Sequence, residues 1–161
     1  MDYLLHFVFS FIATACFGVI FNAPIKALPI CGFVGAVGWT VYYMLMQYNV
    51  TEVQSTFVAS FGIAIVAQFF ARWFKTPMIV FYVAGIIPLV PGGIAYNTMR
   101  SIVELDYNSG IEYGMRALMV SGAIAMGLVF AEVMIQLIYR ILNKGRTSMG
   151  SFARLKRQRT K

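Results

Sequence analysis

Two prolines and two adjacent glycines interrupt an apolar stretch near the middle of the sequence, GIIPLVPGGIAYNTM at residues 85–99. A proline inside a helix removes a backbone hydrogen-bond donor and clashes with the preceding turn, at about 3 kcal/mol. We therefore expect the helix to break here and a second half-helix to begin, with free N–H groups at its first turn. Those groups and the positive end of the helix dipole suit an anionic ligand such as a carboxylate. The predicted substrate site consists of Pro88, Pro91, Gly92, Gly93 and Asn97. The alternative is a kink that serves packing alone.

Glu132 is the one acidic residue well inside an apolar stretch. A carboxylate in hydrocarbon costs about 2.5–3.5 kcal/mol on insertion scales, so such a residue faces a cavity, forms a pair or binds protons. Gln136 follows at i+4 on the same helix face, and Gln68 is a weaker candidate on an earlier stretch. We predict a coupling or gating role for these three residues. The alternative for Glu132 is a buried hydrogen bond or an ion pair with Arg72 or Arg140.

The remaining chemistry-bearing residues form no pattern that is typical of an enzyme. His6 is the single histidine, and Cys16 and Cys31 lack the spacing of metal ligands. The sequence has no phosphate-binding loop of the P-loop type and no nucleophile–base pair. We therefore expect a protein that is not an enzyme and that binds no cofactor and no metal.

The composition indicates which elements must position these residues. Of the 161 residues, 60% are hydrophobic and 12% are charged, whereas soluble domains are about half apolar and a quarter charged. Uncharged runs of about 20 residues are long enough to cross a bilayer as helices. We predict an all-α integral membrane protein with five transmembrane helices, the fourth broken at Pro88–Gly93. The predicted spans are residues 3–22, 28–47, 54–74, 77–99 and 115–141, followed by a basic tail at 144–161.

Basic residues predict the orientation, because they collect on the cytoplasmic side of a membrane. With the N-terminus outside, only Arg100 and Arg116 of the 13 basic residues lie outside. A re-entrant hairpin at residues 77–99 would place the basic tail outside, so we favour a crossing helix. The tail at 144–161 is then cytoplasmic and close to anionic lipid, at roughly 1 kcal/mol per charge near the surface. We expect no nucleic-acid partner, since the excess positive charge is confined to this tail.

Small residues recur at helical spacing on two spans and allow helix backbones to approach closely. They are Gly32, Gly35 and Gly38 on the second span and Ala123, Gly127 and Ala131 on the fifth. Such strips pack against helices of the same chain or against a partner subunit, and both possibilities stay open.

The run Pro-Leu-Val-Pro-Gly-Gly at 88–93, with the order of spans around it, resembles the threonine/serine exporter family over nearly the whole chain. The closest likeness is to the small membrane-only subunit type, which corresponds to the C-terminal half of longer members. The resemblance implies export of serine, threonine or a small dicarboxylate across the plasma (inner) membrane. It also implies a larger membrane subunit of the same family, a homo-oligomer, or both as partners. We expect proton coupling; the alternative function is a non-transporting membrane scaffold.

Overall fold

The computed structural model describes residues 2–158, and every regular element in that part of the chain is helical. The predicted all-α class is confirmed. The α-helices are α1 (Asp2–Ile20), α2 (Leu28–Gln47), α3 (Glu52–Phe74), α4 (Ile79–Ile86), α5 (Gly92–Val103) and α6 (Tyr107–Gln158). Two short 3-10 helices, η1 (Ile25–Ala27) and η2 (Ile87–Leu89), precede α2 and follow α4.

Four of these helices are long and apolar enough to cross a membrane: α1, α2 extended by η1, α3 and the 107–141 part of α6. The segment Ile79–Leu89 and α5 form a fifth candidate span if the pair is counted as one, with a bend of 50° between them. The predicted helix break at Pro88–Gly93 is therefore confirmed, and it lies between Leu89 and Gly92.

The last helix differs most from the predicted bounds, because α6 begins at Tyr107 and not at 115 and continues to Gln158. The first two turns are polar, so a prediction based on apolarity starts too late. Asp106 precedes the helix and accepts hydrogen bonds from Ser109, which lower the pKa of this carboxyl group. At 1.5 Å per residue α6 is about 78 Å long, so only part of it fits into a hydrocarbon layer of about 30 Å.

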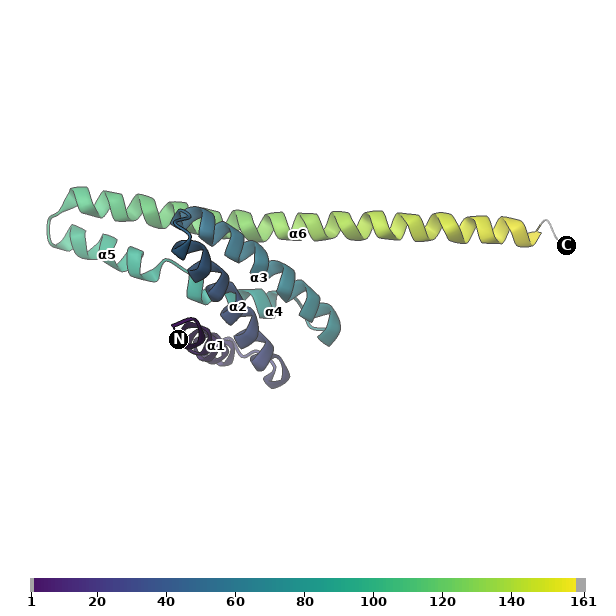
Figure 1. The fold of residues 1–161 in the computed structure, drawn as a ribbon, viewed down its shortest axis with the longest axis horizontal. Coiled ribbons are helices and arrows are strands. Elements are labelled where there is room, and N and C mark those ends of the chain that lie inside the picture. The colour runs from purple at the N-terminus through teal and green to yellow at the C-terminus, as the bar shows by residue number, and fades with distance from the viewer. Residues whose placement is uncertain (1, 159–161) are drawn as a thin grey trace.

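Helices α2 and α3 form the centre of the fold (Figure 1). α2 packs against α1, α3 and α4, while α6 lies along α3. After the break α5 runs away from the bundle, the first part of α6 returns beside it, and none of the α5 residues is buried (Figure 1). The break therefore lies where the chain passes from α4 and η2, which pack against α2, to α5, which packs against α6.

Close packing of these helices depends on the small residues singled out above. A Cβ on Gly35 would overlap the Thr14 side chain, and one on Gly127 would approach the Phe57 carbonyl oxygen to 2.8 Å. Ala123 and Ala131, on either side of Gly127, are buried. Both strips therefore pack within the chain, which confirms the first of the two alternatives.

Candidate functional site

A cavity of about 380 Å³ opens beside the broken helix, and we call it the break cavity. It is bordered by η2, the first turns of α5, the start of α3 and parts of α2 and α6. Four of the five predicted substrate-site residues line it: Pro88, Pro91, Gly93 and Asn97. Gly92 is next to it in the chain but is not part of its lining.

The backbone at the break leaves hydrogen-bond donors at the start of α5. The Gly92 N–H donates to the Val90 carbonyl oxygen at 2.7 Å, so it is already used in the turn. The N–H groups of Gly93 and Ile94 follow in the first turn, and none of the described residues accepts from them. A Cβ added to Gly93 would meet no atom within 4 Å. The predicted free donors therefore exist, shifted by one residue toward Gly93 and Ile94.

An ion pair across the chain completes the cavity, and the sequence did not identify it as part of the site. Arg116 on α6 donates through Nε to Oε2 of Glu52, the first residue of α3, at 2.5 Å. The Arg116 side chain is 51% exposed and that of Glu52 is 19% exposed. In the sequence, Glu52 precedes the predicted span 54–74 and Arg116 is the second residue of the predicted span 115–141, and both ends are expected on the outer side of the membrane. The signal in the sequence that could have suggested this ion pair is that the two residues carry opposite charges and are expected on the same side of the membrane.

Aromatic side chains from α2 form the wall beside this ion pair. Trp39 and Tyr42 line the cavity with ring centroids 5.3 Å apart. The Trp39 indole N–H donates to Nδ1 of His6 on α1 at 3.4 Å, which holds the indole in place. The Thr56 hydroxyl donates to the backbone carbonyl oxygen of Glu52 at 2.8 Å, within the first turn of α3.

The predicted coupling residues lie elsewhere. Glu132 lines a separate cavity of about 230 Å³ and accepts a hydrogen bond from the Gln136 amide at 3.3 Å. Both side chains are exposed when the chain stands alone. An ion pair of Glu132 with Arg72 or Arg140, one of the alternatives for this residue, does not occur among the described residues. The Arg72 guanidinium lies instead over the Tyr139 ring, 3.3 Å from its centroid, where a cation is attracted by the ring face.

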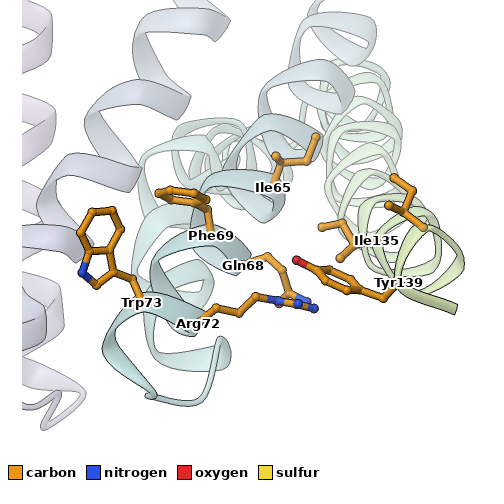
Figure 2. A pocket seen from close by; sticks show the side chains of 8 residues that line it. Ile65, Gln68, Phe69, Arg72, Trp73, Ile135 and Tyr139 are labelled. Atoms are coloured by element: carbon orange, nitrogen blue, oxygen red, sulfur yellow. The ribbon is translucent and has the colours of Figure 1, made fainter. Parts of the chain in front are cut away.

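Gln68 lines a third cavity, of about 550 Å³, between the C-terminal half of α3 and α6. Figure 2 shows Gln68 beside the Arg72 side chain, which reaches toward Tyr139. Most of the lining is apolar, with Phe69 and Trp73 on the α3 side. The structure therefore brings the substrate-site residues together but separates them from Glu132, Gln136 and Gln68.

A family model described as "Threonine/Serine exporter, ThrE" matches residues 6–134. This range contains the whole lining of the break cavity and Glu132, and it ends before Gln136. No solved structure matches the chain.

Proposed function

Since the chain belongs to the threonine/serine exporter family, we propose that it is a subunit of a secondary transporter that exports small carboxylate-bearing metabolites. The family is one of transporters, and the apolar helices make this chain a multi-pass membrane protein. The proposed substrates are serine, threonine or a small dicarboxylate, and the proposed location is the plasma membrane. In the proposed orientation the N-terminus is outside and the basic tail at 144–161 lies against anionic lipid.

One observation carries the proposal: groups that recognise carboxylates surround a single cavity at the helix break. The lining includes Gly93 and Ile94, whose N–H groups have no acceptor among the described residues, and also Asn97 with its amide and Arg116 with its guanidinium group. Hydrogen bonds from charged donors to a carboxylate are about twice as strong as those between neutral groups. A volume of about 380 Å³ is in the range of small-molecule sites, about 300–1,000 Å³.

Proton coupling is assigned in this proposal to Glu132, with Gln136 as its hydrogen-bond partner and Gln68 as a further gating candidate. Glu132 and Arg116 lie on the same helix, α6. A displacement of α6 would therefore move the cavity wall and the carboxyl group together. In this proposal, protonation of Glu132 is linked through α6 to the access of substrate to the break cavity.

A partner chain is part of the same proposal, either the larger membrane subunit of the family or a second copy. Its support is the exposed carboxyl group of Glu132 on the apolar part of α6. An ionised carboxylate facing lipid is costly, and a partner covering this part of α6 would shield it. The exposed apolar side chains of α5, such as Tyr96 and Met99, are suited to the same kind of contact.

The test compares two neighbouring glycines. Gly93 lines the break cavity, so we expect the Gly93→Val side chain to narrow it, whereas Gly92 is not part of the lining; a Cβ at either position meets no atom within 4 Å. Both changes alter helix propensity equally. In proteoliposomes that contain the chain with any co-purifying partner, we expect serine or threonine efflux to fall at least about tenfold in Gly93→Val. Gly92→Val should retain efflux.

Efflux at the wild-type rate in Gly93→Val would contradict the proposed site. If the chain is needed for efflux while both variants are fully active, the scaffold function is the correct one. Size-exclusion chromatography of each variant confirms that the protein is folded and assembled.

A further inference from the structure

The ion pair in the break cavity occupies the group that a substrate carboxylate needs. We infer that Glu52 and Arg116 form a substrate-operated latch, and this inference rests on the proposed function. In the structure the Glu52 carboxylate binds Arg116 beside the break cavity. An arriving substrate carboxylate takes the place of Glu52 on Arg116, and the released Glu52 then binds a cationic group of the same substrate. The pair thereby determines which ligands the cavity accepts.

The geometry makes Glu52 an internal competitor. Its carboxylate oxygen is 2.5 Å from Nε of Arg116, in the position that an external carboxylate would occupy. Half of the Arg116 side chain is exposed, so a ligand can reach the guanidinium group, while Glu52 is mostly buried. A guanidinium group presents several N–H donors in a planar fork, so it can transfer from one carboxylate to another.

The charge balance decides which substrates can open the latch. Separating the pair leaves the half-exposed Arg116 and the mostly buried Glu52 without a partner, and an unpaired charge is costly above all at Glu52. A zwitterion compensates both, with its carboxylate on Arg116 and its ammonium group on Glu52. The aromatic rings of Trp39 and Tyr42 add favourable contacts for an ammonium group. A simple carboxylate compensates only Arg116 and leaves Glu52 unpaired, so it should bind weakly.

The other ionisable residues that line the cavity, among the described residues, are tyrosines. Tyr42 on α2 and Tyr113 on α6 line the cavity and lie close enough to interact with the two charges. A phenol is neutral near pH 7, so neither replaces Glu52 or Arg116 as a charge. The latch therefore depends on these two residues.

The latch also connects helices. Glu52 is the first residue of α3, and Arg116 lies on α6, so the pair joins the beginning of α3 to α6 beside the break. Substrate binding would exchange this direct link for one through the substrate. Separation of α3 from α6 beside the break would thus depend on whether substrate occupies the cavity.

The experiment uses Trp39 as a reporter. The chain has two tryptophans, and Trp73→Phe leaves Trp39 in the cavity wall as the single one; Trp73 is itself 72% exposed. The fluorescence of Trp39 is followed during titration with three ligands. They are threonine, 3-hydroxybutyrate, which lacks the ammonium group, and 1-amino-2-propanol, which lacks the carboxylate. In the otherwise unchanged protein, threonine should bind at least about tenfold more tightly than either analogue.

Two substitutions then separate the roles of the pair. In Glu52→Gln, 3-hydroxybutyrate should bind about fivefold more tightly, because its competitor is gone, and threonine should bind more weakly. In Arg116→Gln, binding of threonine and of 3-hydroxybutyrate should be lost. Arg116→Lys keeps the charge without the planar fork, so it should retain weakened threonine binding.

A matched control is the exposed ion pair of α5, in which Arg100 contacts Glu104 at 2.8 Å outside the cavity lining. Arg100→Gln removes one positive charge and should leave all three affinities unchanged. The latch is refuted if Glu52→Gln leaves the ratio of the threonine and 3-hydroxybutyrate affinities unchanged. It is also refuted if Arg116→Gln binds threonine normally, or if Arg100→Gln has the same effect as Arg116→Gln. If none of the three ligands binds to the protein with Glu52 and Arg116 unchanged, the proposed substrate site itself is wrong.

Discussion

Gly127 on α6 offers a quantitative test of how the two longest membrane helices pack. A Cβ built on Gly127 would lie 2.8 Å from the Phe57 carbonyl oxygen and 3.2 Å from the Phe61 backbone nitrogen, and it would overlap the Ser60 hydroxyl. The first two atoms belong to the backbone of α3, which cannot move aside as a side chain can. Gly127→Ala should therefore separate α6 from α3 at this point or strain both.

The expected magnitude follows from two opposing terms. Replacing glycine by alanine inside a helix stabilises it by about 1 kcal/mol, whereas inserting a methyl group into a filled contact costs about 1–3 kcal/mol. Gly122→Ala, five residues earlier on α6, is the matched control, because a Cβ there meets no atom within 4 Å. The control should be neutral or slightly stabilising. Because the helix-propensity term is common to both variants, their free energies of unfolding should differ by the packing cost, about 1–3 kcal/mol.

The assay is reversible denaturant unfolding in mild detergent, followed by circular dichroism for the wild type and both variants. Glu52 and Arg116 join the same two helices, so Gly127→Ala should also weaken threonine binding. Equal stability of Gly127→Ala and Gly122→Ala would refute the reasoning, because α6 would then not pack against α3 through Gly127.

Two further predictions concern coupling and orientation. Glu132→Gln should reduce proton-dependent efflux without preventing membrane insertion, because the amide keeps the shape of the side chain and loses its charge; unchanged efflux with an unchanged pH dependence would make Glu132 structural. A cysteine at Asn108 should react with an impermeant reagent added outside intact cells, while one at Ser151 should not, in accordance with the positive-inside rule. Labelling at Ser151 from outside would reverse the proposed orientation.

The helical class, the break and most helix bounds could be predicted because they depend on local backbone chemistry. Pro88 and Pro91 cannot donate to a helix wherever the chain is placed, so α4 and α5 are separate helices in the structure as well. α2 occupies the predicted residues 28–47, with Pro29 in its first turn, where a proline is tolerated. The start of α6 was missed because its first turns are polar although they are compatible with a helix.

The candidate site was predictable only in part, for the same physical reason. Pro88, Pro91, Gly93 and Asn97 lie within ten residues of one another, so the local geometry of the break already brings them together. The Glu132–Gln136 contact at i+4 is likewise local.

The ion pair depends instead on the tertiary structure. Glu52 and Arg116 are 64 residues apart in the chain. Arg72 on α3 and Tyr139 on α6 are likewise far apart in the chain and meet only in the folded structure. Which side chains meet between two helices depends on the rotation and the axial offset of each helix, and small contacts such as Gly127 on Ser60 decide both. By itself the sequence determined a membrane protein with a broken helix that offers free N–H groups. Only the packing of α6 against α3 decided that an arginine and a glutamate would face that break, because their meeting is a property of helix docking and not of any local stretch of chain.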